Sequence, residues 1–330
     1  MYKESMESIS LMKLNAYYQD RRFGNKNLMT LFKLKESIKS FGDLLRNIAN
    51  IRKQGFAQTS LQIRAYFKPK LIEDHRLMYN FDHSSEIEYT PHHKEIHGKI
   101  AVYTSIYGNY DSVVQPLYKS PYCDYFAITD QDIPSNEVWK KYDMSFIPEF
   151  EEMDAYHKSK YCKMFPHILF PNYEYSIWVD GNVQIVADLL PLVDRLKEDH
   201  FMGTFKNPLH DCIYTEAKYN LVQNYAKASE LMNQVNLYKE AGFPEKFGMR
   251  EFSVIVRKHN NAECIKLMEQ WWEQVNQYTM RDQISFPYVL WKSGRTISTI
   301  QLLGENWRWN PRFLWCPHNW HINYASKKTH

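Results

Sequence analysis

The stretch YEYSIWVDGNVQI, residues 173–185, decides the fold predicted for this chain. Its apolar run YSIWV is rich in aromatic and β-branched residues and is typical of a buried strand. Asp180, Gly181 and Asn182 follow at once and predict a turn at the carboxyl end of that strand. Ligands of open α/β sheets bind just outside the carboxyl ends of the strands. The sequence therefore places Asp180 where chemistry is expected.

The Asp180-Gly181-Asn182 turn has two interpretations. A carboxylate with a second oxygen ligand on Asn182 suits a hard divalent cation that also holds phosphate oxygens. Asp-Gly is also one of the commonest dipeptides of hairpin turns, in which case the strand simply reverses. The tripeptide alone leaves both interpretations open.

Composition bounds the class of protein. The chain has 330 residues, 44% hydrophobic and 24% charged, which is typical of a soluble globular protein with one large α/β domain or a domain with an extension. Aromatic residues reach 15%, a surplus that fits either carbohydrate stacking or a tyrosine-rich core. The five cysteines are scattered without CxxC spacing, which favours a reducing compartment and disfavours a zinc cluster. No signal-peptide pattern and no run of about 18 apolar residues occurs, so we expect a cytoplasmic location.

The amino-terminal part of the chain is basic. Residues 1–70 contain 14 Lys and Arg against 5 Asp and Glu, and residues 8–53 carry apolar residues at helical spacing. Such a basic amphipathic helix can pack on the main domain, lie on an anionic membrane or self-associate. No nucleic-acid-binding motif accompanies the charge, so nucleic acid is not an expected partner.

The main domain is expected to begin at Gly98, so that residues 1–97 form an extension and connector and residues 98–330 the domain. Strands are predicted at 99–106 and 122–129, and this spacing suits the start of a doubly wound sheet. The chain contains neither GxGxxG nor GxxxxGK[ST], so dinucleotide redox chemistry and P-loop chemistry have little support.

Further elements follow along the chain. Helices are predicted at 151–170 and 188–200, at 260–278 and from Arg281, and strands at 201–205 and 251–257. A further helix is predicted to open after the loop 206–211 and to continue through 219–238. Lys160 and Lys163, one helical turn apart, can neutralise a diphosphate or remain ordinary solvent lysines. Asp282, at the start of a helix, can be a cap or a catalytic carboxylate.

Four ordered motifs carry a family resemblance: KIAVYTSIYGNYD, YCKMFPHILFPNYEYSIWVDGN, PLHDCIYTEA and RDQISFPYVLW. Together they resemble the turgor-defect/mucilage-related glycosyltransferase-like domain family over residues 98–295. The resemblance implies a GT-A type fold, which is a Rossmann-like, doubly wound mixed sheet, here with a helical amino-terminal extension. It also implies binding of a nucleotide sugar through an Asp-containing turn and a divalent metal, Mn²⁺ or Mg²⁺.

Residue roles follow from the resemblance. The expected metal ligands are Asp180 and Asn182, where Asn replaces the second Asp of a DxD motif, with His318 or His321 as a further ligand. The residues expected at the nucleotide sugar are Thr104, Ser105, Tyr107, Gly108, Asp130, Lys160, Lys163, Arg281 and Gln283, the two lysines at its diphosphate. The residues expected around the reacting sugar are Asp282, Glu216 and His210. An inverting reaction needs a base, for which Asp282 is the first candidate and Glu216 the second, whereas a retaining reaction needs none.

The expected function is therefore glycosyl transfer. The donor is a nucleotide-diphosphate sugar, and the acceptor is a glycan or a lipid-linked glycan of surface polysaccharide biosynthesis. Residues 1–70 suggest peripheral contact with an anionic membrane at its cytoplasmic face. Two alternatives remain, which are a metal-dependent hydrolase that uses the Asp180 cluster and a noncatalytic carbohydrate-binding protein.

Overall fold

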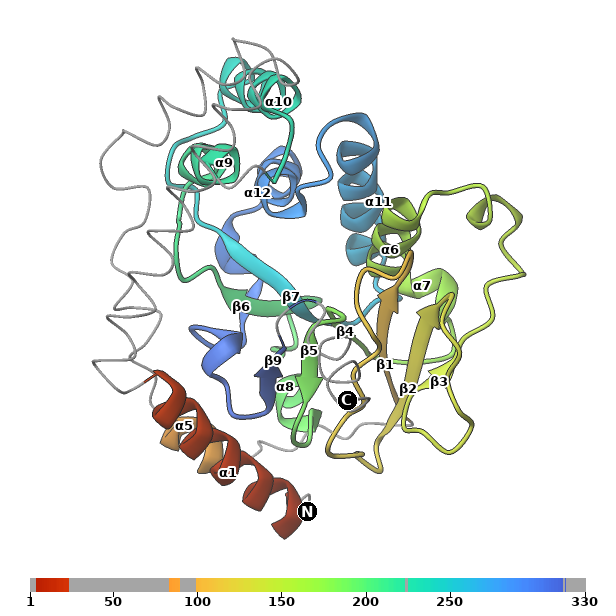
Figure 1. The fold of residues 1–330 in the computed structure, drawn as a ribbon. Coiled ribbons are helices and arrows are strands. Elements are labelled where there is room, and N and C mark those ends of the chain that lie inside the picture. Colours follow the sequence, from red (N-terminus) through yellow and green to blue (C-terminus); the bar gives the residue numbers. More distant parts are fainter. Residues whose placement is uncertain (1–3, 24–82, 90–98, 223–224, 317, 319–330) are drawn as a thin grey trace, which may run out of the picture.

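The computed structural model describes residues 4–23, 83–89, 99–222, 225–316 and 318 (Figure 1). Its centre is a seven-stranded sheet of order β3-β2-β1-β4-β7-β6-β8. The strands are β1 (Ile100–Ile106), β2 (Cys123–Thr129), β3 (Lys140–Lys141), β4 (Ser176–Val179), β6 (Met202–Lys206), β7 (Arg250–Arg257) and β8 (Gln301–Leu302). The pairs among β1 to β4 are parallel, as is β6 with β8, whereas β7 runs antiparallel to both β4 and β6. The mixed α/β sheet expected of a GT-A type domain is thus confirmed.

The sheet is buried on both faces. All seven residues of β1 are buried, because helices and loops cover a parallel sheet from either side. Alternate side chains enter two cores, with Tyr103 and Trp178 on one face and Val102 and Ile177 on the other.

Four helices of the described residues cover the first face. They are α6 (Ala155–Met164), α7 (Pro166–Leu169), α11 (Ala262–Gln277) and α12 (Asp282–Lys292), preceded by the 3₁₀ turn Pro148–Phe150. The helix expected over 151–170 is interrupted at Phe165 because Pro166 cannot continue the preceding turn. Trp271 of α11 is fully buried against Phe252 and Phe286.

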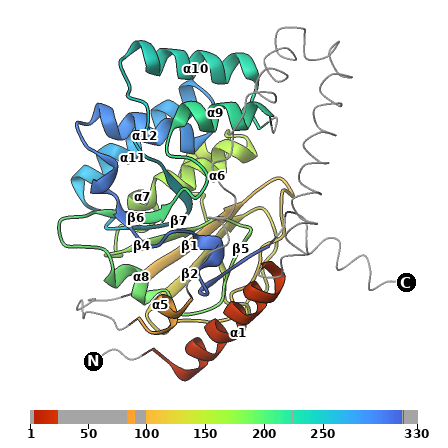
Figure 2. The ribbon, with the colours of Figure 1, turned by 90° about the vertical axis from the view of Figure 1, so that its left-hand side faces the viewer.

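A second helical layer packs on α12. It consists of α9 (Ile213–Val222) and α10 (Ala228–Glu240), whose apolar side chains meet those of α12 around Ile284. The helix expected over 219–238 is therefore two helices, and each presents its own apolar face to α12. Figures 1 and 2 place these helices at the opposite end of the molecule from α1 (Met6–Phe23) and α5 (Ser84–Ile87).

The other face of the sheet carries α8 (Leu190–Asp194), much shorter than the helix expected over 188–200, and a two-stranded ribbon. The ribbon pairs β5 (Val183–Ile185) antiparallel with β9 (Phe313–Trp315). The 3₁₀ turns Ile297–Thr299 and Trp307–Trp309 precede β9 in the chain. Since β5 pairs with β9 and β4 pairs with β1 and β7, the Asp180 turn is not a hairpin.

The described part of the extension packs on the main domain. Asn15 of α1 donates to the carbonyls of Pro311 and Phe313 at 3.0 and 2.8 Å. The buried Arg312 binds Glu4 with contacts of 2.7 and 3.1 Å. Most of the predicted basic helix, and the boundary expected at Gly98, lie outside the described residues. Within the described segments, no helix has the length and apolarity needed to cross a bilayer.

All five cysteines are buried: Cys123, Cys162, Cys212, Cys264 and Cys316.

Candidate active site

The candidate site lies at the carboxyl edge of the parallel strands. Asp180 directly follows β4, the 107–111 loop follows β1, and Asp130 follows β2. Because β1 is parallel to both neighbours, all three segments leave the sheet at the same edge. Sequence reasoning predicted this arrangement from the order of strands and polar residues.

The Asp180 turn is fixed by backbone contacts. Its N–H donates to the carbonyl of Ser253 on β7 at 2.8 Å, and its carbonyl accepts from Val183 at 2.9 Å. A Cβ at Gly181 would lie 2.5 Å from Cγ1 of Ile106, so glycine lets the turn lie directly against the end of β1. The Asn182 carbonyl accepts from the N–H of Cys316 at 2.9 Å, which brings the segment after β9 to the turn.

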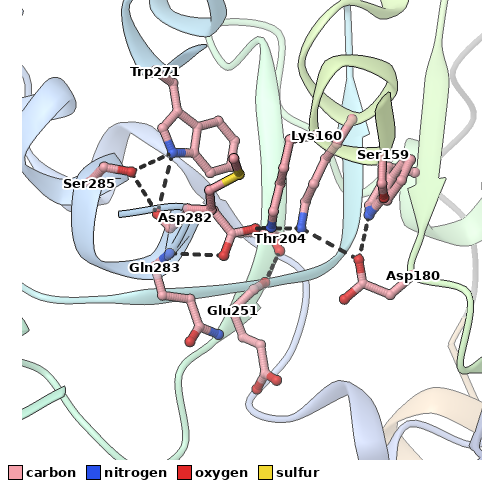
Figure 3. Close-up of polar contacts among 12 residues, drawn as sticks. Ser159, Lys160, Asp180, Thr204, Glu251, Trp271, Asp282, Gln283 and Ser285 are labelled. Carbon is pink, nitrogen blue, oxygen red and sulfur yellow. Dashed lines mark hydrogen bonds and ion pairs between the residues drawn. The ribbon is translucent and has the colours of Figure 1, made fainter. Parts of the chain in front are cut away.

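Two carboxylates meet two lysines beside this turn (Figure 3). Nζ of Lys160 and Nζ of Lys163 each lie 2.8 Å from Oδ2 of Asp282. Nζ of Lys163 also lies 3.4 Å from Oδ1 of Asp180. The side chains of Lys163, Asp282 and Lys160 are 5%, 13% and 15% exposed, whereas that of Asp180 is 33% exposed. Lys163 therefore bridges a buried carboxylate and one that faces solvent.

Local structure positions each of these groups. Asp154 caps the amino end of α6, and Lys163 in its last turn is buried together with Cys162 and Met164. The indole N–H of Trp178, in β4, donates to Oδ1 of Asp180 at 2.7 Å, and Lys163 Nζ lies 5.6 Å from the centre of the Trp178 ring. The cluster is thus assembled from α6, β4 and the start of α12.

The backbone of α12 orients Asp282. Its carbonyl accepts from the indole N–H of Trp271 at 3.3 Å, and its Oδ1 accepts from the N–H of Gln283 at 3.0 Å (Figure 3). Burial alone would raise the pKa of Asp282, but the charges and hydrogen bonds of Lys160 and Lys163 outweigh it and hold that pKa well below its ordinary value. A general base works best with a pKa near the working pH. In this arrangement, Asp282 is better suited to hold the lysines than to accept a proton.

The other candidate base is buried in a separate contact. Nδ1 of His210 lies 2.5 Å from Oε2 of Glu216, and Asn220 donates to Oε1 of Glu216 at 2.9 Å. The side chains of His210 and Glu216 are 1% and 5% exposed. Both carboxylate oxygens of Glu216 are therefore already hydrogen-bonded, and its side chain is not accessible to an acceptor substrate.

His318 approaches the site through the loop after β1. Its Nδ1 lies 2.7 Å from Oδ2 of the buried Asp111, and its ring centre lies 5.0 Å from that of Tyr110. It lies two residues after Cys316, whose backbone N–H donates to the carbonyl of Asn182. His321 lies outside the described residues. Sequence reasoning missed Asp111, although it sits in the quoted loop YGNYD, because nothing in the sequence pairs it with residue 318.

A divalent metal would fit this edge only if the substrate completed its coordination shell. Among the residues that the structure describes, no three His, Cys, Asp or Glu side chains come together as a metal-binding group. Asp180 has both of its recorded contacts on Oδ1, which leaves Oδ2 as its available oxygen. Mg²⁺ and similar ions often take one or two protein carboxylates and complete their shell with substrate phosphates and water. The donor set fits that kind of site, with Asp180 first and Asn182 and His318 nearby.

The expected nucleotide residues separate into two groups. The Gly108 N–H donates to Oδ2 of the exposed Asp130 at 2.9 Å, so these two lie together at the edge. Thr104 and Ser105 are 3% and 5% exposed, and their side chains point to opposite faces of β1. They cannot both face one ligand. Tyr107 packs edge-on against Phe150.

Arg281 and Gln283 flank Asp282 at the start of α12. The Arg281 guanidinium lies 5.2 Å from the ring centre of Tyr225, in the connection between α9 and α10. The hydroxyl of Tyr156, on α6, donates to the carbonyl of Met280 at 3.4 Å. The spacing of four residues places Tyr156 on the same helix face as Lys160, but the sequence gives neither Tyr156 nor Tyr225 a role at the site.

Comparison with known proteins finds a matching family model and a similar curated protein. The family model described as "TOD1/MUCI70, glycosyltransferase-like domain" matches residues 136–307, just over half of the chain. The chain is similar to a curated Arabidopsis thaliana protein, "Probable hexosyltransferase MUCI70", with 24% identity over 221 residues. The match covers 58% of this chain and 37% of the relative, so the chain spans little more than a third of that protein.

Two solved structures show weaker likeness. The apo structure of the bifunctional glycosyltransferase WbbM has a TM-score of 0.38 and 12% identity, covering 64% of this chain and 39% of its own. The mannosyltransferase Ktr4p of S. cerevisiae has a TM-score of 0.27 and 10% identity, covering 75% and 77%. Superpositions at these scores do not bear on the roles of individual residues.

Proposed function

The chain belongs to the TOD1/MUCI70 glycosyltransferase-like domain family, and on that premise we propose that it transfers a sugar from a nucleoside-diphosphate sugar to a hydroxyl group of a glycan. The observation that carries the proposal is the cluster of Lys160, Lys163, Asp180 and Asp282 at the carboxyl edge of the sheet. The donor diphosphate would bind there, with its nucleoside toward Gly108 and Asp130.

Donor count supports a diphosphate. Each lysine ammonium has three N–H donors. Lys163 uses two on Asp282 and Asp180 and Lys160 uses one on Asp282, which leaves three for phosphate oxygens. Asp282 keeps both ammonium groups in place before the donor arrives, so little reorganisation is needed when charge grows on the leaving diphosphate.

Mn²⁺ or Mg²⁺ is part of the proposal. Asp180 would hold the ion through its available oxygen, with Asn182 or His318 as further ligands. The bound ion would neutralise the charge of the departing diphosphate. In this proposal Asp282 and Glu216 position neighbouring groups, which is supported by the ion pairs of Asp282 and the buried contacts of Glu216. The protein's main contribution is then stabilisation of the leaving group.

The acceptor and the location extend the proposal. The acceptor would be a glycan or a lipid-linked glycan of surface polysaccharide biosynthesis, made at the cytoplasmic face of a membrane. The support is the basic character of residues 1–70. Stronger binding of the full chain to vesicles with anionic lipid than to neutral vesicles is the expected result, and equal binding would remove membrane contact from the proposal.

The test of the central proposal has two stages. The first is a thermal-shift screen of the purified chain against uridine, guanosine, cytidine and adenosine diphosphates and their hexose conjugates, with and without Mn²⁺. A ligand that binds the folded state raises the midpoint by mass action. A Mn²⁺-dependent rise with one nucleotide family is expected, and no rise with any would contradict the proposal.

The second stage separates transfer from hydrolysis. The donor identified in the screen is incubated with glycan acceptors, and the products are resolved by mass spectrometry. A glycosylated acceptor supports a transferase. Free sugar as the only product, at the same rate with and without acceptors, would support the hydrolase instead.

A further inference from the structure

Exposed tyrosines gather beside the proposed donor site. The described residues include six tyrosines that are at least 40% exposed, and three of them lie at the carboxyl edge of the sheet or contact the segment that starts α12. These are Tyr110 in the loop after β1, Tyr156 on α6 and Tyr225 before α10, which are 64%, 47% and 51% exposed. The other three lie on α1 and at the amino end of β2, away from this edge. We call Tyr110, Tyr156 and Tyr225 the tyrosine cluster.

Arg281 joins the tyrosine cluster. Its guanidinium lies over the ring of Tyr225, 5.2 Å from the ring centre. Tyr156 reaches the residue before Arg281, because its hydroxyl donates to the carbonyl of Met280. Lys160, which lies over the ring of Tyr156, binds Asp282, so the cluster borders the buried carboxylate of the proposed donor site.

Each ring is held in place although its surface is open. Tyr156 donates to the carbonyl of Met280 at 3.4 Å and carries Nζ of Lys160 5.6 Å from its ring centre. The ring of Tyr110 packs edge-on against that of His318, and the ring centre of Tyr225 lies 6.3 Å from that of Tyr219. Tyrosine side chains that are already ordered offer large contact areas at a low cost in conformational entropy. The rings are therefore pre-arranged for a ligand that has flat apolar faces and many hydroxyl groups.

We propose that the tyrosine cluster and Arg281 form the acceptor subsite, in which pyranose rings of a glycan stack on the tyrosines and their hydroxyl groups bind Arg281. The inference rests on the proposed function and specifies its acceptor as a pyranose oligosaccharide. The C–H faces of a pyranose ring match an aromatic face, and a guanidinium offers five N–H donors to the ring hydroxyls. The cluster borders Asp282, while the nucleoside is assigned to Gly108 and Asp130.

The test uses the full chain on an array of pyranose oligosaccharides. The wild-type protein is expected to bind at least one of them, and Tyr110→Ala and Tyr225→Ala are each expected to weaken that binding at least about fivefold. Tyr225→Phe retains the ring and is expected to bind nearly as well. Tyr122→Ala is the matched control, because Tyr122 is 40% exposed but precedes β2 at the opposite edge of the sheet.

Three outcomes would overturn the inference. They are no binding by the wild type, unchanged binding by both alanine variants, and equal loss in Tyr122→Ala. A thermal-shift measurement with nucleoside diphosphate on the same variants separates the inference from its premise. Unchanged nucleotide stabilisation in the alanine variants supports an acceptor subsite, whereas its loss would assign the tyrosines to the nucleotide. A wild-type chain that binds oligosaccharide but no nucleotide would instead contradict the proposed function.

Discussion

Lys163 and Asp282, 119 residues apart in sequence, lie 2.8 Å apart from Nζ to Oδ2 and join α6 to α12 beneath the proposed donor site. The two side chains are 5% and 13% exposed. Lys163 reaches Asp180 from the same position. The pair therefore links the stability of the helical layer to the charge balance of the site.

Asp282→Ala is expected to destabilise the protein strongly. Removing one partner of a buried ion pair leaves the other uncompensated, and here two lysines lose their carboxylate. The expected loss is about 3–5 kcal/mol in the free energy of unfolding, measured by urea denaturation. Glu263→Ala is the control, because it breaks an ion pair with Arg295 in which the side chains of Glu263 and Arg295 are 55% and 24% exposed. It is expected to cost no more than about 1 kcal/mol. Similar losses in the two variants would contradict a buried cluster.

The stabilisation by Asp282 is expected to depend on pH in the acid range. The folded state holds the pKa of Asp282 well below its ordinary value, so its contribution is complete above the unfolded pKa, about 4, and is lost as the pH falls below it. The stability difference between the wild type and Asp282→Asn should therefore be the same at pH 7 and pH 5 and smaller at pH 3. Urea titrations at the three values measure it. A difference that is constant or growing down to pH 3 would contradict the pairing.

Local patterns predicted much of the sheet. The strand after Tyr175, the strands at 99–106 and 122–129 and the antiparallel strand at 251–257 are confirmed within one or two residues, because apolar β-rich runs and their turn residues are local signals. The ribbon of β5 and β9 was not predicted. It joins segments about 130 residues apart, and three-residue strands carry no periodicity of their own.

The site was only partly accessible from sequence. Asp180 and the lysines were identified as candidates because their types and positions suit a diphosphate. Their contact with Asp282 could not be predicted, since it depends on how α6 and α12 both pack against α11. For the same reason, sequence reasoning ranked Asp282 as a base without detecting the two ammonium groups that lower its pKa.

Asp180→Asn is expected to impair transfer far more than folding. Its side chain is 33% exposed, and the amide can still accept from Trp178. The loss of the carboxylate charge should lower the transfer rate by about 10²–10³ if Asp180 holds the metal ion that stabilises the leaving group. The melting temperature should change little. Asp132→Asn, at a fully exposed carboxylate, is the control and should retain full activity. Full transfer by a folded Asp180→Asn protein would remove Asp180 from the site.

Asp111→Asn tests whether His318 serves a bound metal. Asp111 pairs with Nδ1 of His318 at 2.7 Å, the contact by which a carboxylate commonly orients a metal-ligating histidine. The expected effect is a 10–100-fold loss of Mn²⁺ affinity. It is measured as a higher Mn²⁺ concentration at half of the nucleotide-induced thermal shift. Asp199→Asn removes a similar carboxylate from His200 at 2.8 Å and should change nothing. A Mn²⁺ requirement that Asp111→Asn does not alter would exclude His318 as an oriented ligand.

Arg312→Ala tests how firmly α1 belongs to the domain. Arg312 is fully buried and binds both oxygens of Glu4, and it also donates to the carbonyl of Asp188 at 2.7 Å. Its removal leaves Glu4 and Glu86 without this charge, so a loss of about 3–5 kcal/mol is expected in urea denaturation. Arg295→Ala, at the exposed pair with Glu263, is the control. A small effect of Arg312→Ala would mean that the amino-terminal segment is not held by this contact.

Gly181→Ala is expected to disturb the Asp180 turn through its contact with Ile106. The added Cβ would lie 2.5 Å from Cγ1 and 2.6 Å from Cδ1 of Ile106, and the third-nearest atom is Cβ of the same side chain at 3.9 Å. Ile106 is only 5% exposed, so we expect the turn to shift. The expected cost is about 1–3 kcal/mol in the free energy of unfolding, with a parallel loss of transfer because Asp180 moves with the turn.

A double-mutant cycle with Ile106→Ala separates this contact from other effects of the substitution. Ile106→Ala opens space and should itself cost about 2–5 kcal/mol. In that background Gly181→Ala should cost almost nothing, which gives a coupling energy of about 1–3 kcal/mol. Gly242→Ala is the control, since a Cβ there meets nothing within 4 Å and only its positive φ is strained. The loss in the free energy of unfolding caused by Gly242→Ala should be the same in the wild-type and Ile106→Ala backgrounds. Equal costs of Gly181→Ala in both backgrounds would show that the close approach to β1 does not hold the turn.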